Sequence, residues 1–547
     1  TVVTFVGSPE AVLEAAFQGV KCSGEVIDMR HHHGAHPRSG ACDVLPLVPV
    51  AETTLEECAE LARGLENGSF SSEAVTDAYL ENISLQNSTL NVFLEVFGDT
   101  AREEARASDR RRREGKPLSR LDGVPFAVKD NLCVEGRLCT CASRMLENYR
   151  SPYTATAVRR LQESGMPLLG RVNLDEFAMG SSTETSFFGP SRNPWDASRV
   201  PGGSSGGCAA AVAAGMAPVA LGSDTGGSIR QPAALCGVAG IKPAYGTVSR
   251  YGLVAMASSF DQIGPLCKTC GDAALVMNLL AGSDPRDMTS DPSLAADFTS
   301  ELERPLENVM IALPQEAFGQ GLDADVERAV RTAAEAFRRL GAEIETVSLP
   351  SLPFGLPAYL VLSCAEAGSN LARYDGVRYG HRAPAEEIHQ LYRESRREGF
   401  GMEVKRRILL GAYSLTEEQR VESYDRAVQA RALLQKELER VLGSADALLF
   451  PTTATTAWPI GEKQDDPAQM YLSDLYSVPA NLAGLPALSL PCGLSGEGLP
   501  MGMTLMGDRE SLPLLFRLAA RYETECPLPK GSYPYERLTT GQEGARA

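Results

Sequence analysis

The stretch that decides the fold holds two glycine-serine clusters, Gly202-Gly203-Ser204-Ser205-Gly206-Gly207 and Asp224-Thr225-Gly226-Gly227-Ser228-Ile229-Arg230. A run of small apolar residues, Cys208 to Ala220, lies between them. Glycine lets backbone N–H groups approach a ligand closely, and serines in such turns combine an exposed hydroxyl with nearby N–H donors. One such cluster alone is usually a flexible loop. Two clusters joined by a segment that packs tightly favour a reactive site.

The sequence around these clusters alternates between strand and helix patterns. Lys129 ends an apolar run within residues 121–131 that is typical of a buried strand. The other strand candidates are residues 167–172, 217–223, 237–241, 309–313, 343–349, 447–450, 487–490 and 503–506. Helical periodicity marks residues 72–86, 102–113, 155–164 and 323–340, and most of 356–442. This alternation predicts an α/β fold, a sheet with helices on its faces.

Charge and composition exclude some classes of protein. The chain has 547 residues, of which 43% are hydrophobic, so a large core is available. Its formal net charge of -18 argues against a general binder of nucleic acid or anionic membranes, which carries a basic surface. Four consecutive arginines at 110–113 suggest an RNA contact, but the interleaved Glu103, Glu104 and Asp109 favour a solvated helix face. The apolar run 208–221 is too short to span a bilayer.

The cysteines and the chain ends bear on compartment and domain organisation. Thirteen scattered cysteines without an apparent signal peptide predict reduced thiols. The lone pair Cys267 and Cys270 allows a zinc or redox site, although packing is the stronger interpretation. Residues 1–52 form an expected N-terminal extension, flexible or targeting, whose four histidines could also bind metal. We expect one domain at 53–525, with a helical insertion around 356–442, and a C-terminal tail at 526–547.

The candidate chemistry is serine chemistry without histidine. No histidine occurs between Pro37 and Gly380, which argues against a Ser-His-Asp triad. The sequence contains neither GxxxxGK[ST] nor HExxH, so it supports neither a Walker A nucleotide site nor that zinc site. A buried lysine with a lowered pKa can instead deprotonate a serine. Lys129, Ser204 and Ser228 are the candidates; the alternative for Lys129 is a surface lysine at a strand end.

The two clusters, together with residues 237–243, resemble the signature of the amidase signature family. The positions of Lys129, Ser204 and Ser228 agree with the Ser-cisSer-Lys triad of that family. The resemblance implies a central mixed, twisted sheet covered by helices on both faces. It implies that Ser228 is the nucleophile, Ser204 a proton-relaying serine that follows a cis peptide bond, and Lys129 the base. The implied oxyanion hole is formed by the backbone amides of Thr225, Gly226, Gly227 and Ser228.

A narrower resemblance links the chain to the family of A subunits of glutamyl-tRNA(Gln) amidotransferases. The matching segments are residues 172–186, 248–254, 258–265, 374–380, 403–407, 465–467 and 481–486. This resemblance implies that the chain hydrolyses glutamine to supply ammonia. Arg407 is expected to hold the α-carboxylate of glutamine and Asp474 its α-amino group, with Tyr359 nearby. Arg406 is the alternative to Arg407.

The narrower resemblance also implies partners. The B and C subunits would complete a heterotrimer, and Glu-tRNA(Gln) would be met mainly through the partner. No cofactor or metal is expected in this chain; ATP and Mg²⁺ would bind at a partner subunit. A mitochondrial location is expected, with plastid or cytoplasmic alternatives. The alternative functions are a stand-alone amide hydrolase of the same family and a non-catalytic scaffold subunit.

Overall fold

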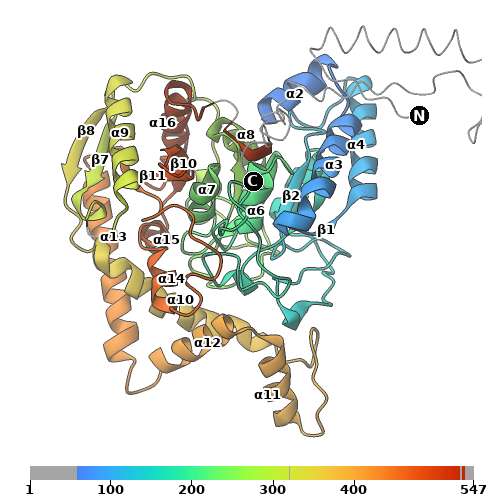
Figure 1. Cartoon of the computed structure of the whole chain (residues 1–547), viewed down its shortest axis with the longest axis vertical. Helices are drawn as coiled ribbons and strands as arrows, with labels where there is room; N and C mark the ends of the chain where they lie inside the picture. The colour runs from blue at the N-terminus through green and yellow to red at the C-terminus, as the bar shows by residue number, and fades with distance from the viewer. Residues whose placement is uncertain (1–57, 320, 530–531, 536–547) are drawn as a thin grey trace, which may run out of the picture. The chain divides into compact units, whose positions relative to one another are not determined.

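The computed structural model describes residues 58–319, 321–529 and 532–535. Those between 58 and 529 belong to one compact unit. Its strands form a single eleven-stranded mixed sheet, in the order β1-β3-β2-β4-β6-β5-β10-β11-β9-β7-β8 (Figure 1). The strands are β1 Phe93–Val96, β2 Phe126–Lys129, β3 Leu168–Val172, β4 Val219–Asp224, β5 Ala239–Lys242, β6 Gln262–Cys267, β7 Met310–Pro314, β8 Glu343–Val347, β9 Ala447–Pro451, β10 Ala487–Leu494 and β11 Pro500–Met506. The predicted α/β class with a mixed sheet is confirmed.

Two strands of the sheet are absent from the prediction. β1 has only four residues and includes the charged Glu95. β6 contains Gly264 and Pro265, which are both depleted in strands. β6 nevertheless pairs antiparallel with β4 along six residues, so tertiary pairing overrides its local preference. β4 pairs parallel with β2 on its other side, which brings Lys129 and Asp224 to neighbouring strand ends.

Helices cover both faces of the sheet. They are α2 Cys58–Asn67, α3 Ser72–Leu90, α4 Gly98–Arg113, α5 Thr156–Glu163, α6 Gly206–Ala213, α7 Arg230–Cys236, α8 Cys270–Leu280, α9 Ala324–Arg339, α10 Gly355–Asn370, α11 Ile388–Gly399, α12 Met402–Ser414, α13 Arg426–Leu442, α14 Pro467–Leu472, α15 Val478–Ala483 and α16 Leu512–Glu525. α8, α9 and α16 pack against one face, and α6 and α7 against the other. The sequence of α6 is almost entirely glycine and alanine, and all its residues are buried.

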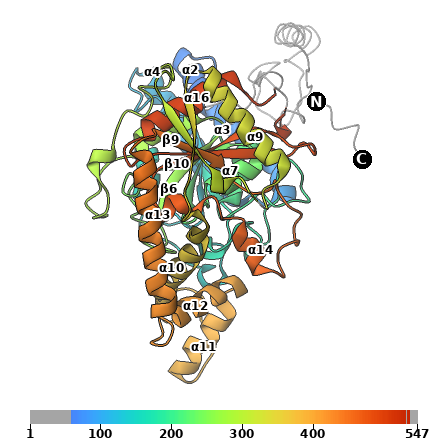
Figure 2. The same ribbon diagram turned by 90° about the vertical axis from the view of Figure 1, so that its left-hand side faces the viewer.

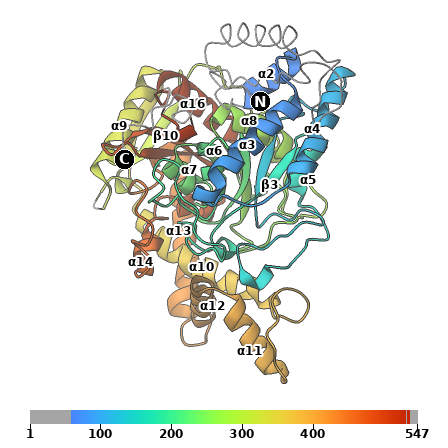
Figure 3. The same ribbon diagram turned by 45° about the vertical axis from the view of Figure 1, so that its right-hand side comes forward.

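Helices α10 to α13 fall in the range of the predicted helical insertion, and they lie together at one end of the unit in Figures 1 to 3. α10 packs against α12 and α13, and it also contacts α15. The buried side of α12 includes Val404, Arg407, Gly411 and Ser414. An arginine on a buried helix face needs a polar partner, so this helix carries more than packing residues.

Four other expectations concern the arginines at 110–113, the pair Cys267 and Cys270, metal binding and membrane spanning. In α4, Arg111 pairs with the carboxylate of the buried Asp122, and Arg112 Nε donates to the Asp122 carbonyl, so two of the four arginines bind Asp122 within the chain. Cys267 and Cys270 are buried free thiols. The described residues contain no cluster of three potential metal ligands and no helix with the length and apolar character to span a bilayer. The N-terminal extension lies outside the described residues.

Candidate active site

Lys129 is fully buried at the end of β2, at the centre of a group of serines. Its Nζ lies 2.8 Å from Ser204 Oγ and 2.8 Å from Ser205 Oγ. Ser223 Oγ is 2.9 Å away and the Ser223 carbonyl 3.2 Å away. Asn131 Nδ2 donates to the same Ser223 hydroxyl. The structure therefore excludes a surface position for this lysine.

The surroundings of Lys129 favour a neutral amine. Burial lowers the pKa of Lys129 to about 8, although the more distant carboxylates of Asp175, Asp224 and Asp261 act in the opposite direction. Among the described residues no carboxylate forms an ion pair with it. Its neighbours are instead hydroxyls, which can donate to an amine as well as accept from it. A lysine in this setting can accept a proton near neutral pH.

The segment around Ser204 is shaped by close backbone packing. The Gly203–Ser204 peptide bond is cis, which is the geometry that the resemblance implies. A Cβ atom at Gly203 would overlap Asp175 Oδ2, so only glycine fits there. The Asp175 carboxylate also accepts the N–H groups of Ser182 and Thr183, at 3.2 and 2.8 Å. Asp175 thus orders residues 182–183 next to Gly203 and Ser204. The sequence did not predict this role.

Ser228 lies beside the first cluster with its hydroxyl free. The Ser205 N–H donates to the Ser228 carbonyl at 3.0 Å, which joins the two glycine-serine clusters. Ser228 is 8% exposed, and its hydroxyl makes no hydrogen bond within the described part of the chain. It lies just before α7, where helix N–H groups have no intrahelical partner. An accessible, unengaged hydroxyl in this position suits a nucleophile.

Three of the four predicted oxyanion-hole amides are available, and one is not. The Gly227 N–H donates to Asp224 Oδ1 at 2.9 Å, so it is already used inside the loop. The N–H groups of Thr225, Gly226 and Ser228 donate to no acceptor among the described residues. These three N–H groups are therefore the unengaged members of the predicted donor set, which stays a prediction. The Thr225 hydroxyl donates to Asp261 at 2.7 Å, which fixes the start of the loop.

Asp224 organises this loop through a buried ionic network. Its Oδ2 accepts the Ile229 N–H, and both of its oxygens accept from the Arg230 guanidinium at 3.0 to 3.1 Å. Asn481 Nδ2 also donates to it, at 2.9 Å. Burial alone would raise the pKa of Asp224, but Arg230 chiefly reverses this and holds the pKa at about 2. The carboxylate stays charged, and its hydrogen bonds hold the 224–230 turn in place.

The residues expected to hold glutamine surround the same loop. A Cβ at Gly226 would overlap the Tyr359 ring, so this ring lies directly on the loop. Ser477 Oγ donates to the Gly226 carbonyl at 2.5 Å, and Asp474 is one turn earlier in the chain. Burial raises the pKa of Tyr359, and the charges of Arg407 and Asp474 both act on that pKa. Tyr359 therefore lies against the loop, and Arg407 and Asp474 are near enough for their charges to act on its pKa.

Arg406 and Arg407 occupy different environments. The side chain of Arg407 is 3% exposed, whereas that of Arg406 is 37% exposed. Arg407 Nε donates to Glu403 at 2.8 Å, and its guanidinium lies 5.4 Å from the centre of the Tyr471 ring. Glu403 also accepts the Tyr471 hydroxyl at 2.9 Å. Within the described residues Arg407 has no other hydrogen-bond acceptor, so donors remain on a fixed guanidinium. Glu403 and Tyr471 hold the Arg407 guanidinium in place. The sequence did not predict this role, because it depends on the contact between α12 and Tyr471.

The amidase family model matches residues 74–511. This chain belongs to the amidase signature family. Similar amidase-family proteins include the A subunit of the glutamyl-tRNA(Gln) amidotransferase from Thioalkalivibrio sulfidiphilus, 49% identical over 86% of this chain and 98% of that protein. The corresponding protein from Prochlorococcus marinus, with the same name, is 51% identical over 87% of this chain and 99% of its own length.

Solved structures of the amidase signature family agree with the fold. The A subunit of the glutamyl-tRNA(Gln) amidotransferase from Thermotoga maritima superposes with a TM-score of 0.73 at 40% identity, covering 89% of this chain and 97% of that one. A bacterial aryl acylamidase of the family gives a TM-score of 0.77 at 27% identity, covering 88% of this chain and 98% of that one.

A second family model, that of the N-terminal subdomain of the formiminotransferase domain, matches the sequence at residues 1–91.

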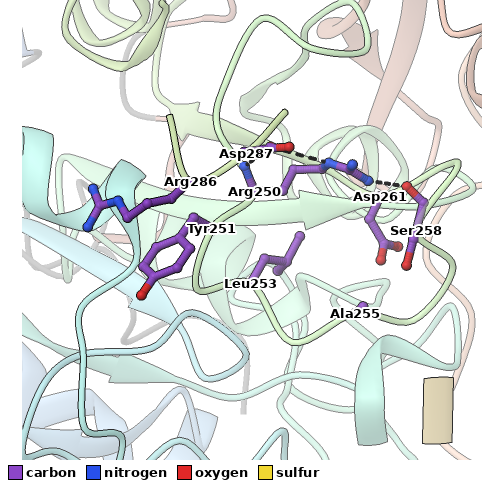
Figure 4. Close-up of a pocket in the computed structure, with 8 residues that line it drawn as sticks. All are labelled: Arg250, Tyr251, Leu253, Ala255, Ser258, Asp261, Arg286 and Asp287. Carbon is purple, nitrogen blue, oxygen red and sulfur yellow. Dashed lines mark hydrogen bonds and ion pairs between the residues drawn. The ribbon is translucent and has the colours of Figure 1, made fainter. Parts of the chain in front are cut away.

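A further pocket has a volume of about 190 Å³ (Figure 4). In it Arg250 links Asp287 and the Ser258 carbonyl. The lining residues are Arg250, Tyr251, Leu253, Ala255, Ser258, Asp261, Arg286 and Asp287. The catalytic candidates Lys129, Ser204 and Ser228 do not line it. Asp261 connects this pocket to the candidate active site, because its carboxylate accepts the hydroxyl of Thr225.

Proposed function

We propose that this chain is the glutaminase subunit of a tRNA-dependent amidotransferase, which supplies ammonia for converting Glu-tRNA(Gln) to Gln-tRNA(Gln). One observation carries the chemistry: a fully buried lysine, which pairs with no carboxylate of the described residues, lies 2.8 Å from Ser204 and beside the loop that carries Ser228. The choice of substrate is supported by near-full-length relatives that are named as the A subunit of this amidotransferase.

In the proposed reaction, Ser228 Oγ attacks the side-chain amide carbon of glutamine. The serine proton passes through the Ser204 hydroxyl to the neutral Lys129 amine. The N–H groups of Thr225, Gly226 and Ser228 stabilise the oxyanion. The tetrahedral intermediate collapses, its C–N bond breaks, and the proton held by Lys129 returns through Ser204 to the leaving ammonia. Water, deprotonated along the same route, then hydrolyses the glutamyl ester and restores the Ser228 hydroxyl.

The complex-level roles belong to partners. The B subunit would receive the ammonia and activate Glu-tRNA(Gln) with ATP and Mg²⁺, and the C subunit would bridge the two. This division of labour is consistent with an acidic chain that has no phosphate-binding loop motif. The relatives named above are bacterial proteins, so they lend no support to the expected mitochondrial location, which stays a prediction.

Reconstitution tests this function directly. The full chain, mixed with the B and C subunits from the same source, should form Gln-tRNA(Gln) from Glu-tRNA(Gln) when glutamine and ATP are supplied. Ammonium chloride should replace glutamine when this chain is left out. A stand-alone amide hydrolase would instead hydrolyse small aliphatic or aryl amides at full rate without partners and would add nothing to the amidation reaction.

Arg407→Ala should raise the KM for glutamine about 10²-fold while kcat changes little. A buried guanidinium can grip a carboxylate with two charge-assisted hydrogen bonds, and losing such a pair costs about 3 kcal/mol. Steady-state kinetics of glutamine hydrolysis measures this change. Arg406→Ala is the matched control, because its side chain is far more exposed and shares Glu403. A larger KM effect from Arg406→Ala would move the carboxylate site to that residue.

The KM for glutamine should rise as the pH falls below about 7. Burial raises the pKa of Asp474 to about 7, although the Ser181 hydroxyl and the charge of Arg407 act to lower it. Below that pH the carboxyl is neutral and cannot attract the α-ammonium group, which stays protonated throughout. KM measured from pH 5.5 to 8.5 checks this. Asp474→Asn should raise KM and remove this inflection; an unchanged inflection would assign it to another group.

A further inference from the structure

Glu176 is a buried carboxylate that the proposed reaction does not use. Its side chain is buried, with 3% of the residue exposed. It follows Asp175, which orders residues 182–183 next to Gly203 and Ser204. Its Oε1 accepts the Ser143 hydroxyl at 2.5 Å, and its Oε2 accepts the Gly401 N–H at 2.8 Å. Gly401 is 225 positions later in the chain. Burying a carboxyl group is unfavourable unless it is hydrogen-bonded, and these two contacts provide the hydrogen bonds. The question is what the chain gains from a buried carboxyl group at this position.

The partner segment is the beginning of α12. Gly401 is the N-cap residue of this helix, and no side chain of its own caps the helix. A Glu176 carboxyl oxygen, from a distant segment, therefore accepts the N–H of the N-cap residue, one of the N–H groups that the helix itself leaves without a partner. A Cβ at Gly401 would overlap Glu176 Oε2, so the contact leaves no room for a side chain. This contact fixes α12 along its own axis.

The two ends of this contact carry different parts of the site. Asp175, next to Glu176, holds the segment that packs on Gly203 and Ser204. α12 carries Arg407 and its partner Glu403. Phe177 and Ala178, which follow Glu176, have left-handed φ values of 51° and 62°, so the surrounding structure holds this segment in a conformation that side chains disfavour. The Glu176 side chain thus joins the segment that packs on Gly203 and Ser204 to α12, the helix that carries Arg407.

We propose that Glu176 is a positioning residue that fixes α12, and with it Arg407, at the correct distance from the catalytic serines. This inference rests on the proposed function, in which Arg407 holds the α-carboxylate of glutamine. Small displacements of a group that binds substrate are costly, because both ends of the ligand must be held at once. Glu176 therefore acts on glutamine binding through α12, without touching the substrate.

Glu176→Ala should raise the KM for glutamine about tenfold and leave kcat within about threefold, because the catalytic serines and Lys129 stay in place. Glu176→Gln keeps an oxygen that can accept the Gly401 N–H, so it should stay within about threefold of the wild type in KM. Gly401→Ala disturbs the same contact from the other side, and it should shift KM in the same direction as Glu176→Ala. Kinetics on the full chain measures all three.

Two readouts separate positioning from general damage. The rate at which a small sulfonyl fluoride labels Ser228 should be unchanged in Glu176→Ala, since this probe has no α-carboxylate. Glu437→Ala is the matched control: the Glu437 carboxylate also accepts one serine hydroxyl and one backbone N–H, both from Ser351, but it lies on α13. This control should leave KM unchanged. Equal loss of labelling and of kcat in Glu176→Ala would overturn the proposal.

A double-mutant cycle with Arg407→Ala measures whether the effect of Glu176 on KM depends on Arg407. If Glu176 acts through Arg407, Glu176→Ala should add less than about twofold to KM once Arg407 is gone. Additive effects would overturn the inference, as would an unchanged KM in Glu176→Ala beside a raised KM in Arg407→Ala; both results leave the proposed function intact. An unchanged KM in Arg407→Ala itself would instead remove the glutamine site of the proposed function, and this inference with it.

Discussion

Ser228→Ala should reduce kcat for glutamine hydrolysis by roughly 10⁶-fold, the scale expected when a serine nucleophile is removed. The expected loss is large because no other described side chain in the 224–230 turn offers a free hydroxyl: the Thr225 hydroxyl is already bonded to Asp261. The fold should survive, since the Ser228 hydroxyl makes no hydrogen bond within the described residues and only its carbonyl joins the two clusters. Initial rates and the thermal unfolding midpoint measure both parts.

Covalent labelling provides the control for Ser228. A serine-directed electrophile should modify the wild type at Ser228, as peptide mass spectrometry would show, and should leave Ser228→Ala unmodified. The same experiment tests the alternative of a non-catalytic scaffold, because a scaffold would not be modified in the wild type. Labelling of Ser204 or Ser205 in the wild type would contradict the assignment of the nucleophile.

The sequence predicted most strands because their apolar runs are bounded by turn residues. β3 and β4 lie within two residues of the predicted ranges, and β2 lies inside the stretch 121–131; together they place Lys129 beside the serine clusters. β6 escaped prediction because Pro265 and Gly264 are poor strand residues; only its pairing with β4 and β5 makes it a strand. Local patterns cannot reveal a strand that long-range pairing creates.

The site was predictable where its chemistry lies in short motifs. Lys129, Ser204 and Ser228 stand in motifs that limit the available chemistry. Asp175, Glu176 and Glu403 also lie in matching segments, 172–186 and 403–407, but their roles depend on contacts that only the fold creates. The support that Asn481 gives to Asp224 spans 257 positions, so no local pattern contains it. The Gly227 amide shows the opposite limit, since the motif included it among the oxyanion donors while the Asp224 side chain already occupies it.

Lys129→Met should reduce kcat by about 10⁴-fold, the upper range for loss of a general base. Methionine keeps a long unbranched side chain, so the buried space at the end of β2 stays filled. Two of the three surrounding hydroxyls keep other partners: Asn131 still donates to Ser223 Oγ, and Ser205 Oγ still donates to the Ser223 carbonyl. We therefore expect a folded protein with normal glutamine binding and almost no turnover. Single-turnover kinetics and equilibrium binding of glutamine separate the two.

The pH profile of kcat tests whether Lys129 is the base in the wild type. Burial lowers the pKa of Lys129 to about 8, and only the neutral amine can take the proton that Ser204 relays. The rate should therefore increase as the pH rises and level off above about 8, in the opposite sense to a group that acts as an acid. The residual rate of Lys129→Met should lack this inflection. A wild-type profile that is flat from pH 6 to 9 would mean that Lys129 does not change its protonation state in the rate-limiting step, and the relay through Ser204 would need another base.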